Sequence, residues 1–162
     1  MNLLLNWPAA IIAVVALQTT FSHFLSVYGI RPDIPLAFAI FAGTAAGGTA
    51  GMTAGFFVGL FCDLLNIGFF GFNIFFLFFV GLCSGAMQKK VFKDNCLFPL
   101  FLSAGFNVAR EAAWAAALFL CGYRLTDTSA LLSAAFGRIA YNILLALPLF
   151  FLFGRIRRLV KR

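Results

Sequence analysis

Residues 43–63 read GTAAGGTAGMTAGFFVGLFCD, which places a glycine at every fourth position from Gly43 to Gly59 and an aspartate, Asp63, one step further. Residues four apart stack along one face of a helix, so these glycines form a smooth ridge. In water such a ridge weakens a helix. In a lipid bilayer it lets helix backbones approach closely, which is how membrane helices pack. The stretch therefore predicts tightly packed transmembrane helices.

The composition indicates a membrane-embedded chain along its whole length. Of 162 residues, 63% are hydrophobic and 10% are charged, and the mean hydropathy is +1.01. These values exclude a soluble globular domain and leave room for five or six spans of about 20 residues each. The expected fold class is an all-α, polytopic integral membrane helical bundle. Residues 1–162 are expected to form a single membrane-embedded domain, because no linker or repeat interrupts them.

Two basic clusters follow hydrophobic runs, one at residues 89–93 and one at residues 155–162. Clusters of this kind mark the cytoplasmic face of a membrane protein. They attract anionic lipid headgroups, whereas nucleic acid is not an expected partner for basic residues placed in this way. The chain has one histidine, and its four cysteines lack CxxC spacing. Neither a metal nor another cofactor is therefore expected.

Hydrophobic runs separated by polar turns predict spans at residues 8–28, two within 34–65, 72–88, 96–123 and 130–153. As one helix, the run at 34–65 would be about 48 Å long, against a hydrocarbon core of about 30 Å, so a bend is expected between Gly43 and Gly51. Six spans place both termini on the cytoplasmic side of the membrane. A single kinked helix at 34–65 would instead leave five spans and an external N-terminus.

Six polar or charged residues lie inside the predicted spans: Asp63, Asn107, Arg110, Glu111, Arg138 and Asn142. Such residues are costly in lipid and face the interior of a bundle. Because side chains lean toward the N-terminus of their helix, Asp63 and Arg138 are expected to converge and pair. Asn142 is expected to lie nearly level with Glu111 across the predicted turn at 124–129, within reach of a hydrogen bond to it. A buried polar network that fixes helix register is the simplest interpretation, and an ion path or contact with a partner protein are the alternatives.

One part of the chain resembles a known family. The matching elements are Arg31-Pro32-Asp33 after the first span, the glycine ridge from Gly51 that ends in Asp63-Leu64-Leu65, and Gly68 followed by Gly71-Phe72-Asn73. Together they resemble MreD, the bacterial rod shape-determining membrane protein family. Length, span number and the basic tail agree with this family. The specific part of the resemblance covers residues 31–73, and the second half agrees mainly in hydropathy.

The resemblance implies a function that no single residue demonstrates. It implies a non-enzymatic scaffold of the elongation complex, or rod complex, which directs lateral peptidoglycan synthesis. The implied partners are the single-span protein MreC, the actin-like MreB, a SEDS glycosyltransferase and a class B penicillin-binding protein. The implied fold is similar to the six-helix substrate-binding subunits of energy-coupling-factor transporters.

Under this resemblance, packing or partner contact is expected for Pro32, Asp33, Gly51, Gly55, Gly59 and Asp63. The glycine ridge either contacts an internal neighbour or receives the single helix of an MreC-like partner. A vitamin-binding subunit of an energy-coupling-factor transporter is the alternative function, and it requires an outward-facing pocket with several polar and aromatic groups. A membrane enzyme fits less well, because the sequence has no serine with a base and no clustered carboxylates.

Overall fold

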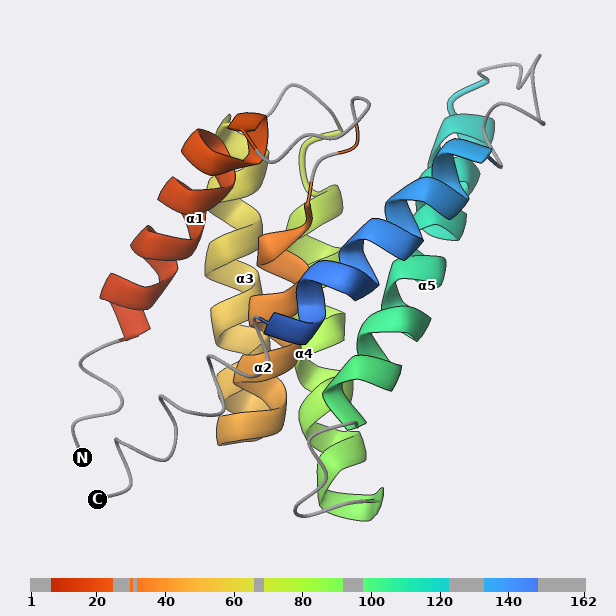
Figure 1. Ribbon diagram of the computed structural model, residues 1–162. Helices are drawn as coiled ribbons and strands as arrows, with labels where there is room; N and C mark the ends of the chain where they lie inside the picture. The colour runs from red at the N-terminus through yellow and green to blue at the C-terminus, as the bar shows by residue number, and fades with distance from the viewer. Residues whose placement is uncertain are drawn as a thin grey trace.

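The described residues form an all-helical bundle (Figure 1). The structure is a computed structural model that describes residues 7–24, 30, 32–65, 69–91, 98–122 and 133–148. Its helices are α1 (Trp7–Phe24), α2 (Ile34–Ala46), α3 (Gly48–Leu65), α4 (Phe72–Val91) and α5 (Phe98–Leu120). A further helix, here called the C-terminal helix, covers residues 133–148. The all-α class is confirmed for the part of the chain that the structure describes.

Successive helices run in opposite directions, so their ends gather at two levels (Figure 1). α1 and α3 end at the level where α2 and α4 begin. We call this level the polar end of the bundle and define it by Asp33 before α2, Asp63 at the end of α3 and Asn73 in the first turn of α4. Helices adjacent in sequence therefore run antiparallel to one another.

The long apolar run at 34–65 forms two helices because specific residues set their ends. Asp33 caps the start of α2, and its carboxylate accepts a hydrogen bond from the Leu36 N–H at 3.1 Å. α2 ends before Gly47, whose φ of +99° lies in the left-handed region that favours glycine. The bend expected within this run is confirmed, and it lies at Gly47.

α2 is the central helix of the bundle. It has 13 residues, which makes it about 20 Å long, and it packs against α1, α3, α4 and α5. Ala39, Ile40 and Ala42 are fully enclosed, and Val58 of α3 and Leu77 of α4 complete the same core. Because its neighbours cover it, α2 need not present an apolar face to the outside.

The glycines of α3 lie directly against α4. A Cβ atom added to Gly51 would meet the carbonyl oxygen of Gly81, and one added to Gly55 would meet the main chain at Leu77. Gly59 continues the same contact one turn further along. The two helices therefore touch backbone to backbone. α4 is therefore the internal neighbour that covers the glycine ridge. This leaves no room on the ridge for the single helix of an MreC-like partner, which was the other hypothesis.

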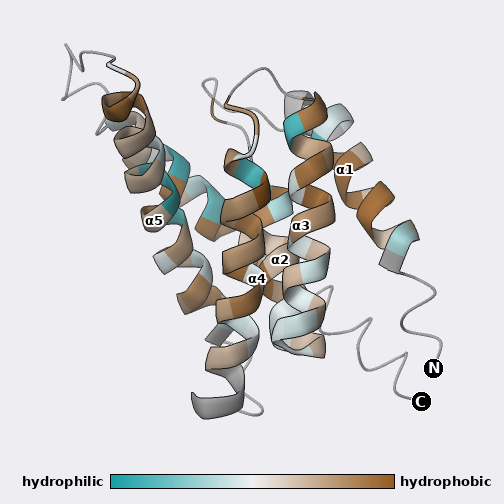
Figure 2. Ribbon diagram, turned by 180° about the vertical axis from the view of Figure 1, so that it is seen from behind, coloured by the Kyte–Doolittle hydropathy of each residue, from teal (hydrophilic) through white to brown (hydrophobic). Residues whose placement is uncertain are grey.

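Hydrophobic residues are spread along every helix labelled in Figure 2, with hydrophilic residues in a few places. Phe75, Phe79, Phe101 and Phe119 are among the large hydrophobic side chains that stay exposed, and apolar exposure of this extent suits a lipid environment. Within the described residues, one helix, Gly48–Leu65, is long and apolar enough to cross a membrane. Shorter apolar helical stretches lie at Pro8–Thr20, Ile34–Ala46 and Phe72–Met87.

Several features of the predicted topology fall outside the described residues. These are the ends of the predicted spans at 25–28, 96–97, 123, 130–132 and 149–153, and the basic tail at 155–162. The number of spans and the side on which the termini lie therefore stay predictions.

Candidate functional site

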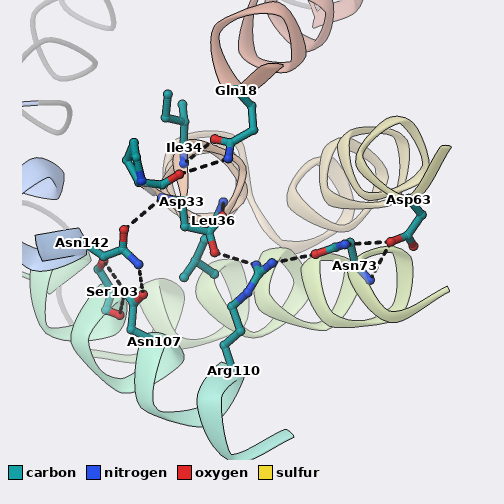
Figure 3. A network of polar contacts seen from close by, with 11 residues as sticks. Gln18, Asp33, Ile34, Leu36, Asp63, Asn73, Ser103, Asn107, Arg110 and Asn142 are labelled. Atoms are coloured by element: carbon teal, nitrogen blue, oxygen red, sulfur yellow. Dashed lines mark hydrogen bonds and ion pairs between the residues drawn. The ribbon is translucent and has the colours of Figure 1, made fainter. Parts of the chain in front are cut away.

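Polar side chains from every described helix except α2, together with Asp33 just before α2, converge at the polar end of the bundle (Figure 3). The contributing residues are Gln18 of α1, Asp33 before α2, Asp63 of α3, Asn73 of α4, Ser103, Asn107 and Arg110 of α5, and Asn142 of the C-terminal helix. We call this set the polar network. Its contacts join two elements or satisfy a helix end, except for the hydrogen bonds of Asn107 to Ser103, which lie within α5.

Asp63 holds the junction between α3 and α4. Its carboxylate accepts hydrogen bonds from the backbone N–H groups of Gly71 and Ile74 at 3.0 Å and of Asn73 at 3.3 Å. It also accepts one from the side-chain amide of Asn73 at 2.7 Å. The first N–H groups of a helix lack intrahelical partners and carry the positive end of the helix dipole. Asp63 therefore acts as a cap for α4 that the preceding helix supplies.

Arg110 is the centre of the polar network, because it joins α2 to α4. Its Nη1 lies 2.6 Å from Oδ2 of Asp33, and its Nη2 donates a hydrogen bond to Oδ1 of Asn73 at 2.7 Å. The contact with Asp33 is an ion pair without hydrogen-bond geometry, so the attraction there is chiefly electrostatic. The guanidinium also lies over the ring of Phe76, 5.7 Å from its centroid. A single side chain thus connects Asp33 with Asp63 through Asn73.

The backbone at the start of α2 is held from two sides. Gln18 accepts a hydrogen bond from the Ile34 N–H at 3.2 Å and donates one to the Pro32 carbonyl at 3.0 Å. On the other side, Oδ1 of Asn142 accepts a hydrogen bond from the Asp33 N–H at 2.9 Å. These side chains satisfy backbone groups that the helix start leaves unpaired. α1 and the C-terminal helix are thereby fixed to α2.

Asn107 and Asn142 connect α5 with the C-terminal helix. The amide of Asn142 donates to Oδ1 of Asn107 at 2.8 Å, and the amide of Asn107 donates to the Ser103 carbonyl at 2.8 Å. Asn107 and Ser103 are buried. Because both ends of the Asn142 side chain are engaged, with Asp33 and with Asn107, it is not available to Glu111. The contact expected between Asn142 and Glu111 is not formed.

Glu111 and Arg138 form a separate pair beside the polar network. Nη2 of Arg138 lies 2.9 Å from Oε2 of Glu111. The expected pair between Asp63 and Arg138 is therefore wrong. Asp63 has donors much nearer along the chain, in the first turn of α4. The long side chain of Arg138 reaches sideways to α5, which outweighs the direction in which its Cα–Cβ bond leans.

The structure brings most of the predicted site residues together. Asp33, Asp63, Asn107, Arg110 and Asn142 belong to the polar network, and Glu111 and Arg138 adjoin it. Pro32 contributes its carbonyl group to the network. Gly51, Gly55 and Gly59 take no part in it and lie along the contact between α3 and α4.

Sequence reasoning misses three members of the polar network, namely Gln18, Asn73 and Ser103. Asn73 carries a visible signal, since it ends the Gly71-Phe72-Asn73 element of the family resemblance. Gln18 is a lone amide within an apolar run, and Ser103 has no distinguishing pattern. Also missed are Gly81 and Gly85 of α4, which meet Gly51 and Gly48 of α3. Their four-residue spacing repeats that of the ridge and could have identified α4 as its neighbour.

A cleft of about 290 Å³ opens beside the polar network. Its polar wall carries three carboxylates and two guanidinium groups, from Asp33, Asp63, Glu111, Arg110 and Arg138. Its aromatic wall is built by Trp114, whose ring centroid lies 5.3 Å from that of Phe69 and 5.2 Å from that of Phe72. The cleft thus combines charged groups with an aromatic surface at the polar end of the bundle.

The charged groups around the cleft are committed to holding the helices together. Asp63 accepts hydrogen bonds from the start of α4. Asp33 forms an ion pair with Arg110, and Glu111 forms one with Arg138. A general acid or base needs a proton-transfer group directed at a substrate, and these carboxylates are directed at protein donors. In the described part of the chain, no group of three or more His, Cys, Asp or Glu residues could hold a metal ion.

Fold and site together define an all-helical membrane bundle whose interior charges serve as structural connections. The family model for the rod shape-determining protein MreD matches residues 1–160. The chain therefore belongs to the MreD family of membrane proteins, and its role lies in determining cell shape. No curated protein and no solved structure matches the chain.

Proposed function

We propose that the chain is a non-enzymatic membrane scaffold of the rod complex, which helps to organise lateral peptidoglycan synthesis. In this role it binds an MreC-like single-span protein and works with the actin-like MreB, a SEDS glycosyltransferase and a class B penicillin-binding protein. Membership of the MreD family supports this function over that of an energy-coupling-factor transporter subunit. A likeness of fold to those subunits stays a proposal.

The observation that carries the scaffold proposal is the commitment of the polar network to structure. Arg110 connects the start of α2 with the start of α4, and Asp63 caps α4. Buried charges that act in transport or catalysis need free capacity toward a substrate or ion. Here the charged groups make their contacts with other helices of the bundle, which is expected of a scaffold protein.

We also propose six membrane spans with both termini in the cytoplasm of a bacterial inner membrane. The alternating directions of the helices support this arrangement. So do the basic clusters at 89–93 and 155–162, which follow the fourth and sixth predicted spans. Contact of these clusters with anionic lipid belongs to the same proposal.

The experiment removes the Glu111–Arg138 pair in cells depleted of their own copy of the protein. Exchanging both residues for glutamine leaves neither charge unpaired, so the bundle should keep its fold. We expect depletion to turn rod-shaped cells round, and we expect both the wild-type chain and the Glu111→Gln/Arg138→Gln variant to restore rods. Both should co-purify the MreC-like partner from detergent extracts.

Two outcomes would contradict the scaffold role. Cells that stay rod-shaped on depletion would remove the link to cell shape. A double variant that accumulates normally and co-purifies the partner, yet leaves cells round, would show that the charges perform chemistry. The single variant Arg138→Gln, which leaves Glu111 without its partner, is the control for a loss of shape that comes from misfolding.

A further inference from the structure

α5 and the C-terminal helix are attached to each other by two polar contacts that lie in register. The amide of Asn142 donates a hydrogen bond to Oδ1 of Asn107 at 2.8 Å. Nη2 of Arg138 lies 2.9 Å from Oε2 of Glu111. On each helix the two contact residues are four apart, so the contacts are one helical turn from each other. We call these two helices the arm, and we call α2 with its capping residue Asp33, α3 and α4 the body.

The arm is packed more loosely than the body. Within the body, α3 and α4 touch backbone to backbone along the glycine ridge. Among the described residues, α5 contributes one buried hydrophobic side chain, Leu102, and the C-terminal helix contributes one, Ala146. The residues of α5 that follow Asn107 are not buried, and at the polar end the arm leans away from the body (Figure 1). Elements with few buried apolar contacts separate from a fold at low cost in free energy.

Two hollows lie between the arm and the body. A cavity of about 190 Å³ is lined by Leu36 of α2 and Leu145 of the C-terminal helix, among others. An apolar groove of about 630 Å³ is lined by Phe79 of α4 and Ala109 of α5, among others. Well-packed protein interiors contain few voids larger than a water molecule. Close packing therefore does not hold the arm in one position against the body.

Asp33 is the residue at which both helices of the arm are fixed to the body (Figure 3). Its Oδ2 lies 2.6 Å from Nη1 of Arg110, which belongs to α5. Its backbone N–H donates a hydrogen bond at 2.9 Å to Oδ1 of Asn142, which belongs to the C-terminal helix. Arg110 also donates a hydrogen bond to Asn73 of α4. We call these three contacts, all at the polar end, the latch.

We propose that the arm is a movable part of the fold and that the latch holds it in the closed position described here. When the latch opens, Arg110 and Asn142 leave Asp33 together, and the arm swings outward as one unit. The two contacts within the arm stay intact, because neither of them involves the body. The swing widens the groove beside α4. The latch therefore couples the charged cleft, which Asp33 and Arg110 line, to the width of an apolar groove.

The test measures distances between spin labels by double electron–electron resonance on the protein in lipid nanodiscs. Cys83 of α4 and Cys121, which follows α5, are both exposed, and the distance between them reports on body and arm. The chain has four cysteines, so Cys62→Ala and Cys96→Ala leave only this pair. The 23 residues of α5 span about 35 Å, so a tilt of about 10° from its start moves its far end by about 6 Å.

Opening the latch is expected to move the arm. Arg110→Gln removes two of the three latch contacts, and it should lengthen the mean distance between Cys83 and Cys121 by about 6 Å and broaden its distribution. Asp33→Asn removes the charge that attracts Arg110, but it keeps a side chain that can cap α2. It should shift the same distance in the same direction by less. This milder variant keeps the test decisive if Arg110→Gln folds poorly.

Two further label pairs follow the body and the arm separately. Phe57→Cys with Cys83 reports on the body, and Phe136→Cys with Cys121 reports on the arm, with the remaining native cysteines replaced by alanine. Phe57 and Phe136 are exposed. Both distances should be unchanged by Arg110→Gln.

The double variant Glu111→Gln/Arg138→Gln is the matched control. It removes an ion pair that lies within the arm and does not reach the body. It should leave the distance between Cys83 and Cys121 unchanged.

Three results would overturn the proposal. A distance between Cys83 and Cys121 that stays the same in both Arg110→Gln and Asp33→Asn would show that packing, and not the latch, holds α5 in place. A change between the two labels of the arm would show that its helices do not move as one unit. A change between the two labels of the body would show a general loosening of the bundle.

Discussion

Replacing Gly55 with leucine is expected to abolish the folded protein. A side chain at this position would enter the main chain of α4 at Leu77, and backbone atoms on a packed helix cannot move aside as a flexible side chain can. Overpacking typically costs about 1–3 kcal/mol when side chains can adjust, and here the two helices must separate instead. The expected result is little or no monodisperse protein in detergent extracts.

Gly105→Leu is the matched control for this prediction. Gly105 also lies within an apolar helix, α5, but a Cβ atom added there meets no other atom within 4 Å. Its leucine variant should be extracted at wild-type levels, because the added side chain faces outward. Gly55→Ala should fall between the two. Equal yields of Gly55→Leu and Gly105→Leu would show that α3 and α4 do not touch backbone to backbone.

Asp63→Ala is expected to cause the second-largest loss, about 3 kcal/mol of the free energy of unfolding. The estimate combines the loss of a helix cap with the loss of hydrogen bonds to a charged acceptor. Asp63 is 7% exposed, so water cannot easily replace it at the start of α4. Asp63→Asn keeps one acceptor oxygen and should lose less. Thermal unfolding in mild detergent measures both variants.

The same measurement separates two possible partners of Asp63. Because Arg138 contacts Glu111 and not Asp63, the losses from Asp63→Ala and Arg138→Ala should add within about 0.5 kcal/mol in the double variant. A combined loss well below the sum would instead indicate a direct contact between Asp63 and Arg138, which is the pair that helix geometry alone predicts. An Asp63→Asn variant as unstable as Asp63→Ala would contradict the capping role.

Patterns along single helices can be read from the sequence of this chain. The four-residue glycine spacing predicts close helix packing, and the excessive length of residues 34–65 predicts the break found at Gly47. Polar and ionisable residues in apolar runs identify four of the eight members of the polar network, because lipid makes them too costly to place elsewhere; they are Asp63, Asn107, Arg110 and Asn142. In each case the argument depends on one helix and its surroundings.

Partners across the bundle cannot be predicted in the same way. The choice of Asp63 between Arg138 and the start of α4 depends on how closely the turn after α3 brings those N–H groups. Gln18 and Asn142 reach the backbone before α2 only because α1 and the C-terminal helix flank it. Such contacts depend on the relative placement of several helices, which residue spacing does not encode.

The central claim is that the polar groups act as one structural network joined by Arg110. Its most direct test is the coupling between Asp33 and Asn73, each of which contacts Arg110. With Arg110 present, the effects of Asp33→Asn and Asn73→Ala on the free energy of unfolding should depart from additivity by about 1 kcal/mol. In an Arg110→Gln background the two effects should add. Additive effects in the presence of Arg110 would contradict the claim, because the two residues would then act independently.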